Sequence, residues 1–179
     1  MKRLIASLLL MVAYPAVSQD QTVPPPSAGL EQLRHIVGNW RVETRFRQQD
    51  GSETKPFVGS YLFEWVIEDA VLRGVSEIPE LGQRSAILFY LRPTRNEIEM
   101  VSVGADGKLW VMTGRDGLET RETPDLPTMD GGTMRLRFTR FNVTPDRFES
   151  RMEWSADQGA NWTPGNHQVF ERCSSDVIC

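Results

Sequence analysis

Several residue types and segments are scarce in this 179-residue chain, and each scarcity excludes a class of protein. Two cysteines are too few for a disulfide scaffold or a cysteine-rich zinc module, and two histidines are too few for a histidine-rich metal site. No Gly-x-Ser-x-Gly, Walker or dinucleotide-binding motif occurs. The net charge of −4 argues against a basic surface for nucleic acid. What remains is an ordinary globular composition, with 40% hydrophobic and 25% charged residues.

Long apolar runs are also missing, apart from one near the start of the chain. The run from Leu4 to Val12 is too short to cross a bilayer as a helix. Lys2 and Arg3 precede it, and the small residues of Ala16-Val17-Ser18 follow it. This order is typical of a secretory signal peptide, here residues 1–18, with an uncleaved anchor as the alternative. We therefore expect an exported protein, periplasmic or secreted, with no membrane span after processing.

The two ends of the exported chain are predicted to lie outside the folded domain. Residues 19–29 contain a run of three prolines and predict an extended linker. Residues 173–179 form a tail with Cys173 and Cys179 at its ends. Export makes a structural disulfide between them possible, whereas a redox pair would favour Cys-x-x-Cys spacing.

The domain begins with a helix and continues as strands. Leu30, Leu33 and Ile36 recur at helical spacing and predict a short helix over residues 28–37. After Gly38 the period changes to two, because Trp40, Val42, Thr44 and Phe46 alternate with charged residues. Similar runs predict further strands at 61–67, 70–78, 87–91, 98–103, 109–113, near 118, 134–138, 148–154 and 163–172.

Turn residues separate these strands at hairpin distance. Examples are Asp50-Gly51, Asp106-Gly107 and Asp116-Gly117. No helix-length period interrupts the strands, so crossover βαβ units are excluded. We predict an all-β fold over residues 30–172: an up-and-down antiparallel barrel of about ten strands, with the short N-terminal helix closing its bottom. A two-sheet sandwich is the alternative.

The order of the strands assigns each connection to one end of the barrel. In a meander the helix and the bottom connections share one end, and the longer loops gather at the top. The top loops are 49–56, 79–83, 105–107, 123–132 and 156–162, and we expect them to form the mouth of the barrel.

The start and the end of the predicted barrel carry a resemblance. Gly38-Asn39-Trp40, after a short helix and opening the first strand, resembles the Gly-x-Trp signature of lipocalins. With the ending from Glu153 to Arg172, the chain resembles a lipocalin-like, calycin-type family of small, often exported bacterial proteins of unknown function. The resemblance implies that Trp40 closes the floor of the barrel and that Arg172 packs over it by a cation–π contact. It implies a barrel and supplies no activity.

A second motif lies near the end of the chain. Ser155, Asp157, Gly159 and Trp162 resemble the Asp-box of sialidase-type propellers. A propeller needs repeats of this unit, and one copy is present. We therefore interpret it as a structural hairpin, in which side chains bond to backbone amides and glycine takes a positive φ.

The inward-facing aromatic residues favour a binding barrel for a small apolar or amphipathic molecule, without metal or nucleotide. The predicted ligand-binding residues are Phe46, Tyr61, Phe63, Trp65, Phe138, Met152 and Trp154. The alternatives are a protein-interaction or envelope-stress module that uses the top loops and, less favoured, an enzyme acting in the barrel. No cofactor is expected: haem through His167 would need this residue to face inward, whereas alternation with Phe170 and Arg172 turns it outward.

Overall fold

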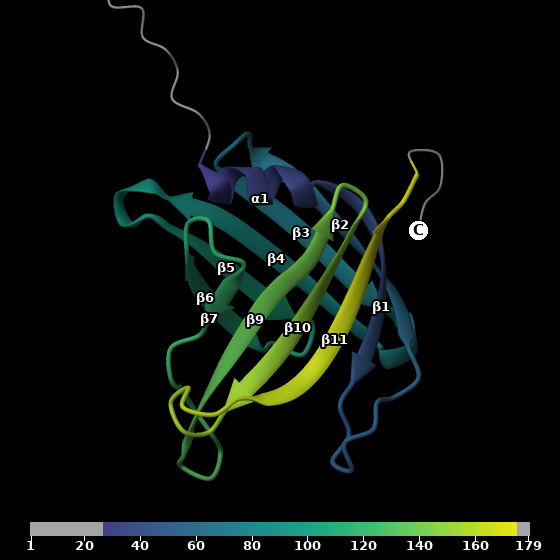
Figure 1. The fold of residues 1–179 in the computed structure, drawn as a ribbon, viewed down its shortest axis with the longest axis vertical. Helices are drawn as coiled ribbons and strands as arrows, with labels where there is room; N and C mark the ends of the chain where they lie inside the picture. Colours follow the sequence, from purple (N-terminus) through teal and green to yellow (C-terminus); the bar gives the residue numbers. More distant parts are fainter. Residues whose placement is uncertain (1–26, 175–179) are drawn as a thin grey trace, which may run out of the picture.

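Ten strands close into an antiparallel barrel with one short helix across its end (Figure 1). The computed structural model describes residues 27–174, so the predicted signal peptide, most of the predicted linker and Cys179 lie outside the described residues. The elements are α1 (Ala28–Ile36), β1 (Gly38–Phe46), β2 (Phe57–Ile67), β3 (Val71–Ile78), η1 (Pro79–Leu81), β4 (Gln83–Arg92), η2 (Pro93–Arg95), β5 (Glu97–Gly104), β6 (Leu109–Arg115), β7 (Thr120–Glu122), β8 (Leu126–Pro127), β9 (Thr133–Thr144), β10 (Arg147–Ser155) and β11 (Thr163–Arg172). Within 27–174, no helix combines the length and apolar character needed to cross a membrane.

The barrel closes because its last strand returns to its first. β1 pairs with β2 on one side and with β11 on the other, and β10 pairs with both β9 and β11. The short β8 lies outside this ring, as a two-residue ladder on β9. The predicted up-and-down barrel is therefore confirmed, and the sandwich alternative is wrong.

The wall of the barrel has its fewest paired residues at β7. One residue pair, Thr113 with Glu122, joins β7 to β6, and three pairs join β7 to β9. The strand predicted near Leu118 lies slightly later in the chain, at Thr120–Glu122. The Leu118 amide bonds to the Arg115 carbonyl within the turn, at 3.1 Å, and its side chain is exposed. The turn at Asp116-Gly117 thus extends past Leu118 before the strand begins.

The alternating pattern in the sequence becomes the two faces of the wall. Trp40, Val42 and Thr44 are fully buried along β1. Between them, Arg41 and Arg45 point outward and both form ion pairs with the Glu43 carboxylate. Because side chains alternate across a strand, one pattern supplies an apolar lumen and a charged exterior.

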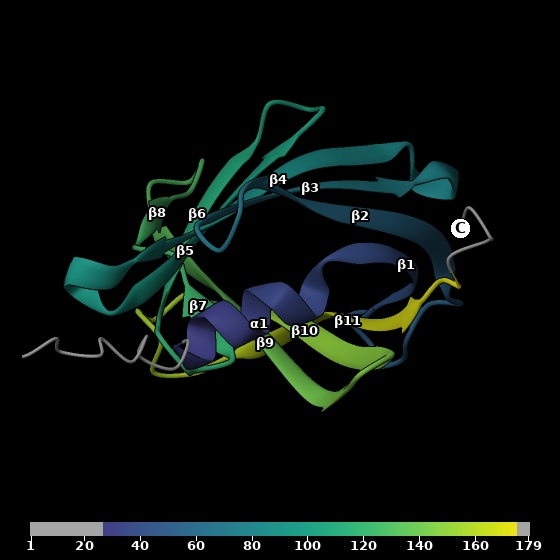
Figure 2. The same ribbon diagram turned by 90° about the horizontal axis from the view of Figure 1, so that it is seen from above.

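Helix α1 lies across one end of the barrel, as the view from above shows (Figure 2). The Ser27 hydroxyl caps its N-terminus by accepting the Leu30 amide at 3.1 Å. Leu33 and Ile36 face the lumen and are buried. We call this the closed end: it comprises α1 and the turns 68–70, 93–96, 116–119 and 145–146.

Two of these turns and the end of β9 hold α1 in place. The Arg34 guanidinium donates to both carboxylate oxygens of Asp69, at 2.9 and 2.6 Å. The Gly29 amide donates to the Asp116 carboxylate, and a His35 ring nitrogen contacts the Thr144 carbonyl at 2.7 Å. Helix α1 is therefore attached to the barrel at several points besides its chain connection to β1.

The structure places the three predicted floor residues together at the closed end. The Arg172 guanidinium lies 4.2 Å from the centroid of the Trp40 ring and donates to the carbonyls of His35 and Val37, each at 2.7 Å. Gly38 has φ +117°, and a Cβ there would lie 3.0 Å from Arg172 Nη1. Glycine at this position therefore satisfies both the backbone conformation and the close approach of the arginine.

The opposite end, the loop end, consists of residues 47–56, 79–82, 105–108, 123–132 and 156–162. The Asp-box residues form one of its hairpins. The Asp157 carboxylate accepts the Asn161 amide at 2.8 Å, and the Ser155 hydroxyl accepts the Gly159 amide, also at 2.8 Å. Gly159 has φ +93°, and the Arg137 guanidinium lies 4.0 Å from the centroid of the Trp162 ring. The motif's contacts are thus internal to the hairpin and its neighbouring strand.

Candidate functional site: a cavity inside the barrel

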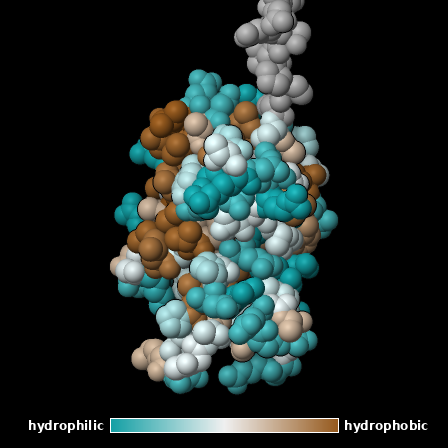
Figure 3. Space-filling view, turned by 90° about the vertical axis from the view of Figure 1, so that its left-hand side faces the viewer, coloured by the Kyte–Doolittle hydropathy of each residue, from teal (hydrophilic) through white to brown (hydrophobic). Residues whose placement is uncertain are grey.

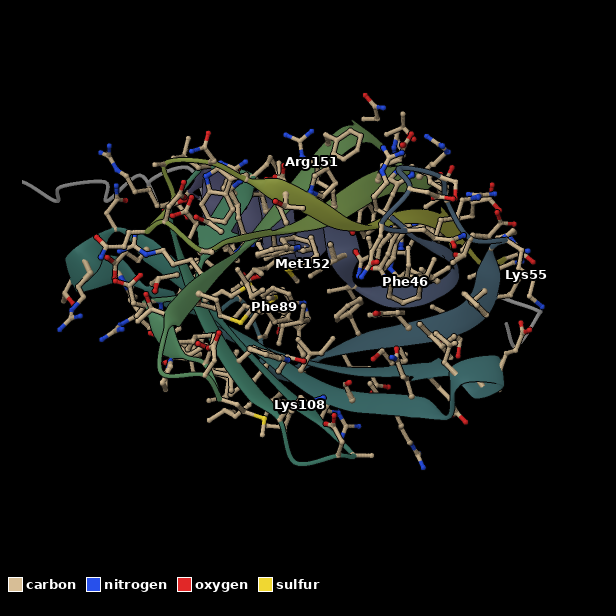
Figure 4. All side chains as sticks on the ribbon, turned by 90° about the horizontal axis from the view of Figure 1, so that it is seen from below. Phe46, Lys55, Phe89, Lys108, Arg151 and Met152 are labelled. Atoms are coloured by element: carbon tan, nitrogen blue, oxygen red, sulfur yellow. The ribbon has the colours of Figure 1, made fainter. Side chains whose placement is uncertain are left out.

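A cavity of about 140 Å³ lies inside the barrel beneath α1. Most of its wall is apolar and comes from α1 and from strands on both sides of the barrel. Its polar side chains are Gln32, Tyr61, Ser102, Arg121, Arg140 and Gln168. Figure 4 looks into the barrel from the loop end, where Phe89 and Met152 lie within the wall of strands. A largely apolar pocket with a few convergent polar groups is the usual form of a small-molecule site.

Four of the seven predicted ligand-binding residues border this cavity: Tyr61, Phe63, Phe138 and Met152. The other three, Phe46, Trp65 and Trp154, do not border the cavity, so their assignment to it is corrected. Facing inward does not set how far along the barrel a residue lies.

Each of the three has a different neighbourhood. Phe46 ends β1 at the loop end and packs edge-on against Phe57, with ring centroids 6.0 Å apart. Trp154 shares a face with Leu136 but lies at the loop end of β10, where it is 42% exposed. Trp65 lies toward the closed end of β2 and packs against the buried core. The cavity thus lies in the part of the lumen next to α1, and Phe46 and Trp154 lie farther toward the loop end.

Two buried arginines in the wall were missed. On β9 the inward alternation continues past Phe138 to Arg140. Extending the pattern by two residues therefore predicts that the Arg140 side chain faces inward. Arg121 lies on the three-residue β7, which is too short to show any period. The helix residues Gln32 and Leu33 were also missed as lining residues, although helical spacing had predicted the face that carries Leu33.

Arg140 is a fully paired charge. Its guanidinium donates to both oxygens of the Glu119 carboxylate, at 2.7 and 2.8 Å, and contacts His35 Nδ1 at 3.2 Å. It also lies 5.5 Å from the centroid of the Phe148 ring. Burial lowers the pKa of His35 below its ordinary value, and the positive charge of Arg140 acts in the same direction. His35 is therefore neutral at pH 7, and the Arg140–Glu119 pair is balanced.

Arg121 is in the opposite situation. It is 4% exposed, and the one hydrogen bond that its side chain makes with the described residues runs from Nη2 to the Gln32 side-chain oxygen, at 3.1 Å. Its Nε atom is buried without a hydrogen-bond partner, and its guanidinium lies 5.7 Å from the centroid of the Phe89 ring. Burial lowers the pKa of Arg121 to about 10, and the charge of Arg140 adds to this effect. At pH 7 Arg121 therefore remains charged.

A short polar network forms another part of the wall. The Gln168 amide donates to the Thr44 hydroxyl at 3.0 Å and to the Tyr61 hydroxyl at 3.3 Å, and the Ser150 hydroxyl donates to the Gln168 oxygen at 3.3 Å. Burial raises the pKa of Tyr61 above its ordinary value, so this phenol stays protonated. These groups form hydrogen bonds with one another, so this part of the cavity wall is polar but uncharged.

His167 lies on the outer face of β11, where its ring contacts the Glu149 carboxylate at 2.8 Å and stacks on Phe141. The irregularity in the β10–β11 pairing lies opposite Met152 and Glu153, so it does not turn His167 inward. Among residues 27–174, no three His, Cys, Asp or Glu side chains come together as a metal site.

An exposed apolar band crosses the outside of the barrel. It is formed by Val58, Leu62, Val75, Leu88, Val103 and Leu109 on strands β2 to β6. Cross-strand pairing places Leu62 beside Val75, and Val103 beside Leu109. Figure 3 shows apolar patches between hydrophilic areas on the side of the barrel that it presents.

Comparisons with known proteins identify the fold and no family. No family model matches the sequence, and no curated protein sequence matches it. The structure of Rv2717c from M. tuberculosis is similar, with a TM-score of 0.57 and 13% identity over 82% of this chain and 98% of that one. The S-type phycobiliprotein lyase CPES from Guillardia theta has a TM-score of 0.50 and 14% identity over 81% of this chain and 92% of that one. The ten-strand barrel and these two structures fit a lipocalin-like fold, and no family is shown. At such low identities the likeness extends to the barrel alone.

Proposed function

We propose that the protein binds a small apolar or amphipathic molecule in the cavity beneath α1. The observation that carries this proposal is an apolar space in the lumen of a barrel whose closing helix, α1, is held by two turns and by the end of β9. A space near 150 Å³ with apolar walls can hold an aromatic ring the size of benzene. Met100, Met112 and Met152 border the cavity, and methionine side chains adapt readily to the shape of a larger ligand.

The size of the cavity sets the expected affinity. Burial of each methylene group contributes about 0.8 kcal/mol, so an eight-carbon chain gains about 6 kcal/mol before the cost of association is subtracted, which sets tens of micromolar as the tightest dissociation constant. A single ring buries less apolar area and binds near the millimolar range. Ligands of this class are therefore detectable by ordinary titration.

The test is a titration with the neutral fluorescent probe N-phenyl-1-naphthylamine. We expect saturable binding to the wild-type chain and loss of at least tenfold in affinity in Ser102→Phe, because Ser102 borders the cavity and a phenyl ring there fills it. Ser60→Phe is the matched control, since Ser60 pairs with the outward-facing Arg41 and Glu77. Absence of saturable binding to the wild type, or equal loss in both variants, would contradict the lumen as the site.

We also propose that the protein is exported, with residues 1–18 as a cleaved signal peptide and a bridge between Cys173 and Cys179 in the mature chain. The basic pair and short apolar run described above support export. Non-reducing peptide mapping of the mature protein should recover the two cysteines in one linked peptide. Two separately alkylated cysteines would remove the bridge from the proposal.

A second candidate function is association with another protein. The exposed apolar band on β2 to β6 supports this candidate, because such side chains gather at interaction surfaces. Leu62→Glu and Leu109→Glu should then abolish association without changing probe binding. Sedimentation velocity of the wild type provides the baseline, and a concentration-independent monomer would leave the band without a homotypic role.

A further inference from the structure

Arg121 forms no ion pair in the described part of the chain, and the carboxylate that acts on its charge, Glu119, is already paired with Arg140. The side chains that border the cavity include no Asp or Glu. An unpaired buried charge is costly, and proteins normally pair it or satisfy its hydrogen bonds.

The hydrogen-bonding capacity of Arg121 is also mostly unused. A guanidinium has five N–H donors, and this one donates to Gln32 at 3.1 Å while its buried Nε has no acceptor. Gln32 comes from α1, which is fixed to the closed end, so the head of Arg121 is held beside the cavity. The remaining donors therefore need an acceptor that the described residues do not supply.

The neighbouring strand accommodates this arginine. Gly114 of β6 lies close to the start of β7, where a Cβ would clash with the Thr120 carbonyl oxygen and would also approach Arg121 Cγ to 2.8 Å. Glycine at this position therefore lets β7 approach β6 and leaves room for the stem of Arg121. On the other side Arg121 pairs with Phe138, which also borders the cavity. The charge thus lies at one side of a mainly apolar space.

We propose that the cavity binds a monocarboxylate, whose carboxylate is paired with Arg121 and whose aliphatic or aromatic part lies against the methionine and phenylalanine wall. This deepens the proposed function and rests on it. A single negative charge balances the single unpaired positive charge, whereas a phosphate dianion would leave one buried negative charge unbalanced. A planar carboxylate also matches the donor geometry of a guanidinium.

The experiment compares octanoate with 1-octanol, which have the same chain length and differ in the charge of the head group. Each is titrated into the full mature chain and followed by tryptophan fluorescence, because Trp110 borders the cavity. For the wild type we expect octanoate to bind at least tenfold more tightly than octanol. Arg121→Met should remove this preference by weakening octanoate at least tenfold while leaving octanol within about twofold.

The matched control is Arg73→Met, because Arg73 is exposed and pairs with Glu64 on the outer wall. It should retain the wild-type preference. If Arg121→Met does not fold, Arg121→Lys keeps the charge and removes the fork of donors, and it should bind octanoate more weakly than the wild type but more tightly than octanol.

The outcomes separate this inference from the proposed function. Equal binding of octanoate and octanol by the wild type, or an unchanged preference in Arg121→Met, would overturn the role of Arg121. The neutral probe would still report the cavity in that case. If probe, octanoate and octanol all fail to bind, the proposed function fails and this inference fails with it.

Discussion

Substitution of Trp40 by alanine tests how the closed end holds the barrel together. The Trp40 side chain is fully buried, its ring nitrogen donates to the Ile36 carbonyl at 2.8 Å, and its ring lies 4.9 Å from the Phe148 ring centroid. It also lies under the Arg172 guanidinium. The residue therefore joins α1, β1, β10 and β11 at one point.

The magnitude follows from these contacts. Truncation of a buried tryptophan to alanine costs roughly 3–5 kcal/mol, through lost burial and the cavity that remains. Within that loss, the hydrogen bond to Ile36 contributes about 0.5–1.5 kcal/mol and the contact with Arg172 about 0.5–2 kcal/mol. Trp40→Phe keeps an aromatic ring and loses the hydrogen bond, so it should cost about 1–3 kcal/mol by leaving the Ile36 carbonyl unsatisfied.

The assay is urea denaturation, followed by far-ultraviolet circular dichroism, with the free energy of unfolding extrapolated to water. We expect the order wild type, Trp40→Phe, Trp40→Ala, with unchanged dependence on urea. Trp162→Ala is a control for a tryptophan of the loop end. A loss below about 1 kcal/mol in Trp40→Ala would refute the view that this residue closes the barrel.

Three further predictions follow from other parts of the chain. Arg121→Met should stabilise the ligand-free protein by about 1–3 kcal/mol in the same urea assay, because it removes an unpaired buried charge; a destabilised variant would mean that the charge is compensated. Hydrogen bonds from Asn161 and Ser155 lower the pKa of Asp157 to about 2, so its stabilising effect should be complete above about pH 4 and be lost as pH falls through 2. Asp157→Asn should flatten that part of the pH–stability curve, and an unchanged curve would contradict this assignment. Intact mass of the exported protein should correspond to a chain that begins at Gln19, and a mass that includes residues 1–18 would exclude cleavage.

The sequence predicts the barrel well because its physical basis is local. Trp40, Val42 and Thr44 alternate with charged residues, and this pattern determines both a strand and the face that it buries. Turn signals such as Asp106-Gly107 and Asp116-Gly117 separate the strands by hairpin lengths. Because each hairpin reverses the chain, the number of strands before a loop determines the end of the barrel at which that loop lies.

The candidate site is harder to predict because it depends on position along the barrel axis. Phe63 and Trp65 share a face of β2, yet Phe63 borders the cavity and Trp65 does not. Arg121 belongs to a strand of three residues, whose assignment depends on its pairing with β9 and not on any pattern of its own. Gln32 reaches the cavity through the docking of α1, which is set by contacts with distant turns such as that of Arg34 with Asp69.

Ligand binding in the lumen is tested most directly through the methionine methyl groups. Met100, Met112 and Met152 border the cavity, whereas Met129 is fully exposed at the loop end and serves as an internal control. In protein labelled with ¹³C at the methionine methyl groups, titration with octanoate should shift the signals of the three cavity residues saturably and leave that of Met129 unchanged. A shift of Met129 with no change at the three cavity residues would place the ligand outside the lumen and contradict the account.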